Sequence, residues 1–499
     1  MDLLYIIIPI ITIILIFLIN FCRGKNLPPT IFPALPIIGH LYLLFLERQP
    51  LQRTLNKLST KYGPILLLRF GYRNVVVVAD PLITEECFTK DNDVIFANRP
   101  KLTFATILAY NSTNTAWAPY GPYWLNLRGI ERTEFFSSLR LQDFYDVRAE
   151  EGKAMLRSIN VPEDTSSKEV DLSSVFADFI TNVIIMWTAG KRFSGEDAAK
   201  AKELQEIVKT TFQLGATNLG DYLPFLKWLG FTKDLEDRMR ALVDLRDTFF
   251  RNLQEEFKQG TGVLVDKNIT MLGVMLKLQA KDPEYWPDEI ISAVLLNLIS
   301  SCIDDCSATM IWALALLLNN PSALKKAQEE IDTVVGTERF LEESDLSNLP
   351  YLGCVVKETM RLYPIVPTLQ PHESSEDCVV QGYNIPKGTV LIVNQWGIHH
   401  DPNLWSDPES FKPERFEGTE STTPKLKFMP FSSGLRMCAG YALAVPVVGL
   451  AIGLVIQSFD WERISEDLVD MTENGGLVLI KDRPLIAKCT PRPIMQNLD

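Results

Sequence analysis

The segment between Pro287 and Pro321 constrains this chain most, because it is almost continuously apolar and carries helix signals at both ends. Pro287 suits a first helical turn, and Asp288 and Glu289 behind it suit the positive end of a helix dipole. Asn320 and Pro321 act as stop signals. The segment therefore predicts one helix of roughly 30 residues, about 45 Å long. A helix that is apolar on most sides must be buried, so a large domain is expected around it.

The middle of this helix is polar and needs an explanation. It reads SSCIDDC, with Cys302, Asp304, Asp305 and Cys306 inside an otherwise apolar segment. Burial of ionisable groups is costly unless they have partners or a function. This centre is the first candidate for chemistry.

We find no linker that would divide the chain into several domains. A chain of 499 residues would suggest about three domains by length alone, yet the polar stretch at 160–169 is a short loop. An apolar content of 46% is enough for one sizeable core. The expected organisation is a leader at 1–25, a proline-rich segment at 26–40 and one domain at 41–499.

The leader predicts a membrane anchor. Its apolar run from Leu3 to Ile19 would span about 26 Å as a helix, close to the hydrocarbon thickness of the endoplasmic reticulum. Asp2 precedes the run and Arg23 and Lys25 follow it, which places the bulk of the chain in the cytosol. A cleaved signal peptide is the rival, but the basic start and the small-residue cleavage site are missing. The expected location is the endoplasmic reticulum membrane, with a single span.

Cysteine usage and charge exclude two classes of protein. The eight cysteines are widely scattered in a chain expected to face the reducing cytosol, so a disulfide framework is not expected. The net charge of −13, without a dense block of Lys or Arg, argues against a nucleic-acid partner.

A second candidate for chemistry lies near the C-terminus, where the loop FMPFSSGLRMCAG opens into a long apolar helix. Cys438 is thus expected at a helix N-terminus. The dipole there lowers the pKa of a thiol, and a thiolate binds soft metals or attacks electrophiles. The alternative for a single cysteine is a buried structural role.

The spacing around Cys438 is specific. Phe431, Gly434, Arg436, Cys438 and Gly440 match F-x-x-G-x-R-x-C-x-G, the haem-thiolate loop. At this point the chain resembles the cytochrome P-450 monooxygenases.

Three further motifs stand before the Cys438 loop, in the order typical of that family. They are W-x-x-x-R at Trp124 and Arg128, E-x-x-R at Glu358 and Arg361, and PERF with Arg415. The resemblance covers the whole chain and is closest to plant microsomal enzymes of specialised metabolism, in particular isoflavone 2′-hydroxylases. It implies a mainly α fold, with a large helical domain and a small β-rich lobe behind an N-terminal transmembrane helix. The runs ILLLRFG and NVVVVAD independently predict a β-hairpin.

The resemblance also implies roles for single residues. Cys438 would be the axial ligand of the iron of haem b, which favours oxygen activation. Side chains that would hold the haem include Trp124, Arg128, His372 and Arg436. Glu358, Arg361 and Arg415 would form a structural charge cluster. Residues expected to line the substrate pocket are Ile365, Val366, Leu369, Leu477 and Val478. Electrons would come from NADPH through NADPH-cytochrome P-450 reductase, with O₂ as co-substrate.

The polar centre of the long helix departs from the family pattern. The usual A/G-G-x-D/E-T is occupied by Ser301, Cys302, Ile303, Asp304 and Asp305, so the acid is kept while the glycine and threonine are replaced. Asp305 can supply the hydrogen bond of the missing hydroxyl only when it is protonated. Burial beside Asp304 would raise its pKa, so the two aspartates are predicted to be a catalytic pair.

Other interpretations of the chain remain open. Cys302 and Cys306 lie four residues apart and could bind a metal, although no histidine is near. The aspartates could instead lie on a solvated face. For the whole protein, we expect a monooxygenase of a small apolar plant metabolite, phenolic, flavonoid or terpenoid. The alternatives are a ring-forming, rearranging or dehydrating haem-thiolate enzyme with little need for NADPH, and a non-catalytic haem-binding homologue.

Overall fold

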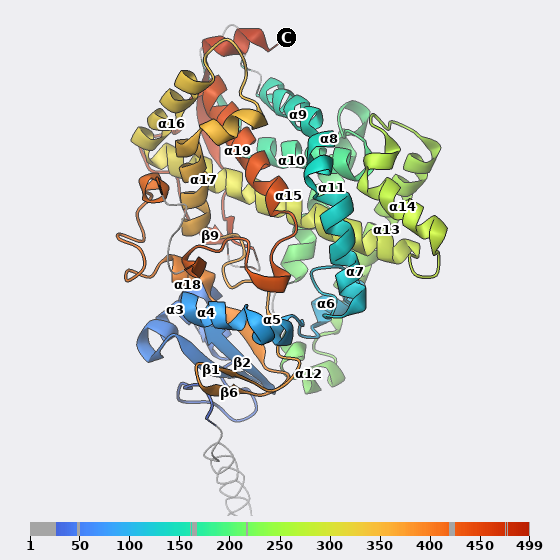
Figure 1. Ribbon diagram of the computed structural model, residues 1–499, viewed down its shortest axis with the longest axis vertical. Helices are drawn as coiled ribbons and strands as arrows, with labels where there is room; N and C mark the ends of the chain where they lie inside the picture. The colour runs from blue at the N-terminus through green and yellow to red at the C-terminus, as the bar shows by residue number, and fades with distance from the viewer. Residues whose placement is uncertain are drawn as a thin grey trace, which may run out of the picture.

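The computed structural model describes residues 26–46, 50–159, 161, 167–215, 218–418, 425–474, 476 and 478–498. Helices make up most of it, and strands β1, β2 and β6 lie together in a small lobe beside the start of the described chain (Figure 1). This is the predicted combination of a large helical part and a small β-rich part. The predicted membrane anchor at 1–25 lies outside the described residues.

The helices differ widely in length. The longer ones are α3 (Leu51–Tyr62), α7 (Pro122–Ile130), α9 (Tyr145–Ser158), α10 (Leu172–Ala189), α11 (Ala198–Leu214), α13 (Lys233–Gln259), α14 (Met271–Lys281), α15 (Asp288–Asn319), α16 (Pro321–Val334), α17 (Pro350–Leu362) and α19 (Tyr441–Ser458). Shorter ones are α2 (Leu43–Leu46), α4 (Pro81–Cys87), α5 (Lys90–Phe96), α6 (Thr103–Ile107), α8 (Ser138–Asp143), α12 (Phe225–Trp228) and α18 (Gln395–His399).

The main sheet has the strand order β1-β2-β7-β4, with β1 (Ile65–Phe70), β2 (Arg73–Val78), β7 (Val390–Val393) and β4 (His372–Glu373). The predicted hairpin is confirmed, because β1 and β2 pair antiparallel from Ile65 opposite Val78 to Phe70 opposite Arg73. Gly71 makes the turn with φ +58°, and a Cβ there would lie 2.0 Å from the Tyr222 carbonyl oxygen. Only glycine satisfies both the backbone angle and this close approach.

The remaining sheets are small. Strand β11 (Ile486–Pro491) lies between β3 (Lys168–Asp171) and β8 (Phe459–Glu462) in antiparallel pairing. Two hairpins pair β5 (Cys378–Val380) with β6 (Tyr383–Ile385), and β9 (Glu473–Asn474) with β10 (Ile480–Lys481).

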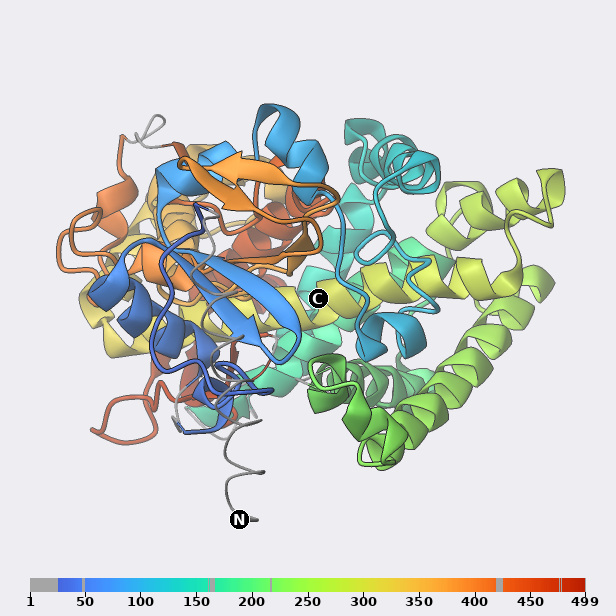
Figure 2. The same cartoon turned by 90° about the horizontal axis from the view of Figure 1, so that it is seen from below.

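The predicted long helix is confirmed as α15, which has 32 residues and follows Pro287 as its N-cap. It runs through the middle of the molecule (Figure 2). Helices α10 and α19 pack against it. Most apolar side chains of α15 belong to the largest buried cluster. The indole N–H of Trp312 donates a hydrogen bond to the Leu479 carbonyl oxygen at 2.9 Å.

Three described helices, α10, α15 and α19, are long and apolar enough to cross a membrane by length and composition. Between 61% and 72% of each apolar stretch is buried inside the protein. Their apolar surface is therefore used by the core.

The charged residues of α17 and the PERF segment meet in the interior. Arg361 donates through Nε to Glu358 Oε2 at 2.7 Å, and Arg415 donates through Nε to Glu358 Oε1 at 2.8 Å. The Lys412 amide also donates to Glu358, and Arg361 donates to the carbonyl oxygen of His399. Glu358 and Arg361 have no exposed surface. These contacts join α17 to the segments that lead to the Cys438 loop.

Candidate active site

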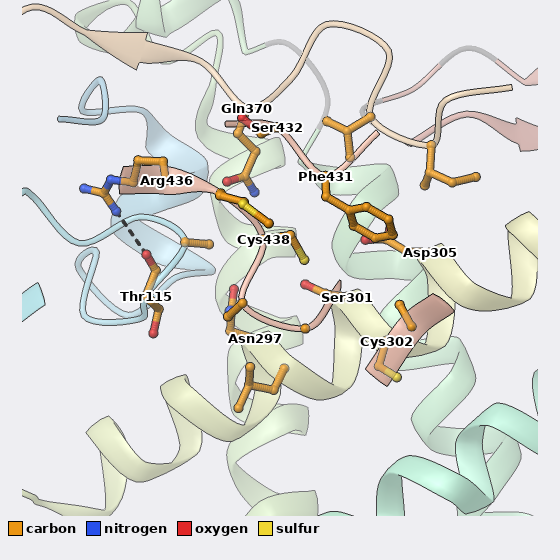
Figure 3. A pocket seen from close by; sticks show the side chains of 18 of the residues that line it. Thr115, Asn297, Ser301, Cys302, Asp305, Gln370, Phe431, Ser432, Arg436 and Cys438 are labelled. Atoms are coloured by element: carbon orange, nitrogen blue, oxygen red, sulfur yellow. Dashed lines mark hydrogen bonds between the residues drawn. The ribbon is translucent and has the colours of Figure 1, made fainter. Parts of the chain in front are cut away.

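A cavity of about 260 Å³ lies between α15 and the loop that carries Cys438. Figure 3 shows side chains of both walls directed toward the space between them. From α15 the lining residues are Asn297, Leu298, Ser301, Cys302, Asp305, Cys306 and Thr309. From the opposite side, Pro430–Ser432 and Arg436–Gly440 contribute, and residues of the segment Ile365–Gln370 close one flank. The long helix and the cysteine loop, separate in the sequence, thus face one site.

The cysteine loop is held by hydrogen bonds on both sides of Cys438. The Cys438 amide donates to the Phe431 carbonyl oxygen at 2.9 Å, and Asp93 of α5 accepts from the Leu435 amide at 3.0 Å. Gly434 has φ +70°, and a Cβ there would lie 2.5 Å from the Asp93 carboxylate. This gives a packing reason for Gly434. Gly440 has an ordinary φ of −89°, and a Cβ there would meet only Phe136 at 3.8 Å, so described contacts do not require glycine there.

The helix N-terminus does not by itself lower the pKa of Cys438, contrary to the expectation from the sequence. Burial raises the pKa of this thiol to about 11, although the Gly440 amide acts in the opposite direction. The Cys438 side chain borders the cavity and is exposed to it. Desolvation therefore outweighs the dipole of α19. A bound metal ion would displace the proton.

Two buried arginines carry positive charge into one flank of the cavity. Arg436 donates to the carbonyl oxygens of Ala97, Thr115 and Ala118 at 2.6 to 3.1 Å. Arg99 donates to the Ala116 carbonyl oxygen and, through Nη1, to the Gln370 and Pro371 carbonyl oxygens. These partners are neutral. Burial and then mutual repulsion lower the pKa of Arg436 to about 8, and burial lowers that of Arg99 to about 9.

A third arginine has an acidic partner. Arg128 donates to Glu131 at 3.2 Å and to the Met437 carbonyl oxygen at 3.0 Å, which ties α7 to the cysteine loop. The Trp124 indole donates to the Thr115 carbonyl oxygen at 3.0 Å, and its ring lies 4.4 Å from the Arg436 guanidinium carbon. The predicted W-x-x-x-R pair thus lies beside Arg436.

His372 also borders this flank. Its Nδ1 lies 2.7 Å from the Phe96 carbonyl oxygen, which can only accept, so Nδ1 carries the proton. Burial and the nearby Arg99 hold the pKa of His372 well below its usual range, which keeps the ring neutral. Its Nε2 would donate to a bound carboxylate only after gaining a second proton.

The donor set fits haem b. Uncompensated buried arginines are costly, and two carboxylates entering this flank would neutralise them with charge-assisted hydrogen bonds. The propionates of haem are two such carboxylates, and Cys438 offers a soft sulfur ligand for iron across the cavity. The apolar Leu443, Ala444 and Val448 line the part of the cavity next to the cysteine loop.

The two aspartates of α15 point in different directions. Asp305 lines the cavity, whereas Asp304 does not and is influenced by Lys209 of α11. Burial and then the charge of Asp304 raise the pKa of Asp305 to about 8, and burial raises that of Asp304 to about 6. The predicted increase in the pKa of Asp305 is therefore present. Its proton faces the cavity, while Asp304 acts on it through space.

The cysteines of α15 lie beside Asp305. Cys302 and Cys306 both line the cavity, and the pKa of Cys306 is raised well above its usual value by its hydrogen bond with Cys302 and by burial. In the described part of the chain, no group of three or more His, Cys, Asp and Glu residues could hold a metal ion. Because both side chains line the cavity, the sulfurs of Cys302 and Cys306 narrow the cavity on the side of α15.

The predicted substrate residues are only partly together. Ile365, Val366 and Leu369 line the cavity. Val478 is buried but is not among the lining residues, and Leu477 lies outside the described residues.

Sequence reasoning missed Arg99 and Asn297 as site residues. Arg99 lies in FANRP, and this local sequence gives no signal that the side chain turns inward. Asn297 lies two turns before Asp305 on α15, so helical spacing from the SSCIDDC centre could have identified it.

Comparisons with known proteins identify the family. A family model described as Cytochrome P450 matches residues 29–488. The (+)-piperitol/(+)-sesamin synthase of Sesamum radiatum is 43% identical over 478 residues, which cover 95% of this chain and 92% of that protein. Isoflavone 2′-hydroxylase of Glycyrrhiza echinata is 38% identical over 482 residues, covering 95% of this chain and 94% of that protein.

The fold comparison agrees. A zebra fish cytochrome P450 structure with progesterone has a TM-score of 0.76 and 28% identity, covering 89% of this chain and all of that one. The resemblance drawn from the motifs, the enzyme class and haem b as the cofactor are therefore confirmed. The chain belongs to the cytochrome P450 family of haem-dependent monooxygenases.

Proposed function

We propose that this protein oxidises a small phenolic, flavonoid or terpenoid plant metabolite, with electrons from NADPH delivered by a partner reductase. The observation that carries this proposal is that Cys438, the arginine flank and Asp305 border one cavity. The named relatives, an isoflavone hydroxylase and a piperitol/sesamin synthase, support an oxygenated aromatic substrate.

The chain's own residues would hold the cofactor. Cys438 would ligate the iron, and the Cys438 loop is fixed by Asp93 and by the Phe431 carbonyl oxygen. Arg99, Arg128 and Arg436 would meet the propionates. Bound haem with a thiolate ligand supplies oxygen activation.

Asp305 would carry the proton that the missing threonine hydroxyl cannot provide. With a pKa of about 8, roughly 90% of Asp305 is protonated at pH 7. A protonated carboxyl donates a hydrogen bond into the cavity and can also release the proton. Asp304, with a pKa of about 6, is mainly ionised at that pH and adds to the rise in the pKa of Asp305 that burial causes.

The reductase would approach the opposite side of the cysteine loop. A groove there is lined by residues between Leu346 and Leu352 at the entry to α17, by Lys357 and by residues between Val445 and Gly449 of α19. It shares Phe431 and Met437 with the haem-side cavity, so a partner in the groove would lie one loop away from the cofactor. The groove supports an electron-transfer partner on this face.

The proposed membrane association has support in the described residues. Phe32 and Ile37 are 89% and 65% exposed, close behind the predicted anchor. Trp228 and Phe231 are 86% and 75% exposed, and the segment that carries them begins beside the β1–β2 turn, where the Tyr72 amide donates to the Tyr222 carbonyl oxygen. These apolar side chains would face the bilayer beside the span at 1–25. The domain at 41–499 would then face the cytosol at the endoplasmic reticulum.

The test combines a spectrum with turnover. The reduced protein with carbon monoxide should show the long-wavelength band of thiolate-ligated haem, and Cys438→Ala should lose it while Cys489→Ala keeps it. A band that persists in Cys438→Ala disproves the ligand assignment. A metabolite panel with reductase should give a product with a changed mass only when NADPH is present. The altered α15 motif favours a second candidate, an NADPH-independent rearrangement, which the same panel without NADPH would reveal.

A further inference from the structure

A buried carboxylate borders the cavity beside the cysteine loop. Glu131 follows α7 directly, is buried and lines the cavity. It opens a single π-helical turn, Glu131–Phe135, in which the Phe136 amide donates to the Glu131 carbonyl oxygen at 2.8 Å. Phe136 lines the same cavity. Turns of this kind are rare and frequently lie at functional sites, so we searched the surroundings of Glu131 for a role.

Glu131 forms an ion pair with an arginine that holds the cysteine loop. Nη1 of Arg128 donates to Glu131 Oε2 at 3.2 Å, and Nη2 of Arg128 donates to the Met437 carbonyl oxygen at 3.0 Å. The Glu131 side chain is 2% exposed and the Arg128 side chain is 25% exposed, so solvent ions screen this pair only weakly. Glu131 therefore orients the guanidinium that anchors the residue before Cys438.

The charges of this pair reach the Cys438 sulfur. Burial is the main cause of the raised pKa of that thiol, and among the charged groups Asp305 and Glu131 raise this pKa whereas Arg128 lowers it. Burial also raises the pKa of Glu131, but its contact with Arg128 favours the ionised carboxylate. A negative charge at this place favours the more positive state of any group that the sulfur binds.

We propose that Glu131 is a positioning residue for the cysteine loop and that its charge lowers the reduction potential of the bound haem. The inference rests on the proposed function, because it takes Cys438 to be the iron ligand. Reduction adds one electron at the iron, so a nearby negative charge makes the reduced state less favourable. Arg128 offsets part of this effect. The ion pair of Arg128 and Glu131 thus sets how readily an electron is accepted at the site.

The experiment measures the midpoint potential of the haem-loaded, full-length protein by spectroelectrochemical titration, without reductase or NADPH. Glu131→Gln removes the charge and keeps the shape of the side chain, whereas Glu131→Asp keeps the charge and shortens the side chain. Glu134→Gln is the matched control, because Glu134 lies on the same π-helical turn but its side chain is 43% exposed and is not part of the cavity lining. Haem content and circular dichroism confirm that each variant is folded.

The expected result is a more positive potential in Glu131→Gln. Loss of one buried charge should raise the equilibrium constant of reduction about tenfold, which equals about 59 mV for one electron. Glu131→Asp should stay close to the wild type, and so should Glu134→Gln, because water screens the charge of Glu134. A role in packing alone predicts the reverse order, since Glu131→Asp changes the packing more than Glu131→Gln does.

A second comparison tests the inference even if Glu131→Gln does not retain haem. Glu131→Gln leaves Arg128 without its acidic partner, whereas Arg128→Gln combined with Glu131→Gln leaves no ion of this pair unpaired. The potential of the double variant should lie above that of Arg128→Gln, in which the charge of Glu131 has lost its counter-charge. Equal potentials of these two variants would overturn the inference.

Two further results would overturn it. One is a potential of Glu131→Gln that equals or lies below that of the wild type, and the other is an equal shift in Glu134→Gln. Failure of the proposed function would be seen in other measurements. The reduced wild type with carbon monoxide would then lack the long-wavelength band, or no panel compound would be oxidised, whereas failure of this inference leaves both the band and the turnover intact.

Discussion

The proton on Asp305 gives a prediction that can be followed across pH. If protonated Asp305 supplies the hydrogen bond and the transferable proton, the yield of product per NADPH should be high while the carboxyl is neutral. Because its pKa is raised, to about 8, the group is neutral below that value and loses its proton as the pH rises through it. This yield, the coupling, should therefore fall as the pH rises above the pKa of Asp305, and the amount of peroxide released should increase in step.

The size of the fall follows from the titration. With a pKa of about 8, the protonated fraction drops from about 0.9 at pH 7 to about 0.1 at pH 9, so coupling should decrease up to about tenfold. Asp305→Asn keeps a donor but has no proton to transfer, so its coupling should be low at pH 7 and nearly constant with pH. Asp305→Thr restores the usual hydroxyl and should couple well with little pH dependence.

Asp304→Asn is the most informative control. The negative charge of Asp304 contributes to the raised pKa of Asp305 without bordering the cavity. Its removal should shift the midpoint of the fall to lower pH and leave the shape intact. The assay is product, peroxide and NADPH measured in parallel from about pH 5 to about pH 9, a range that spans the pKa values of both carboxyls. Equal coupling of all variants at every pH would refute the role of Asp305 and assign the proton to substrate or water.

Further predictions concern stability, haem retention and the membrane. Between its unfolded pKa near 4 and its folded pKa of about 8, Asp305 binds a proton only in the folded state, so wild-type stability falls as pH rises through this window. Asp305→Asn should remove that fall, so its free energy of unfolding should rise by roughly 2 to 4 kcal/mol relative to that of the wild type between pH 4 and pH 7. Urea unfolding of the haem-free proteins measures this difference, and an equal pH dependence in both proteins would contradict it. Glu358→Ala leaves Arg361 buried without its partner and should cost about 3 to 5 kcal/mol, seen as a lower unfolding midpoint, whereas an unchanged midpoint would deny the cluster its structural role. Arg99→Met should release haem faster than the exposed control Arg132→Met in a haem-transfer assay, and equal rates would remove Arg99 from the haem site. Deleting residues 1–23 should free the protein from microsomes with its haem spectrum retained, and sedimentation with membranes in high salt and mild detergent would count against a single-span anchor.

Local patterns were enough to predict the elements that carry the site. The apolar run and its end signals defined α15, because proline, acidic residues and asparagine mark the ends of a continuous apolar helix. Runs of β-branched and aliphatic residues around a glycine turn defined the β1–β2 hairpin. The spacing around Cys438 identified the family, since a ligand loop fixes several residue types at once.

Tertiary structure alone decided which side chains meet and in what state. Arg99 and Arg436 are far apart in the sequence, and only the packing of the chain before α7 against the cysteine loop brings both into one flank. The sequence placed Cys438 near a helix dipole, but the depth of burial determined that desolvation dominates its pKa. The sequence predicted Asp304 and Asp305 as a catalytic pair with Asp305 as the donor, and the orientation of α15 turns only Asp305 to the cavity. Such outcomes depend on the distance from solvent and on the neighbours from other elements, which a linear pattern does not contain.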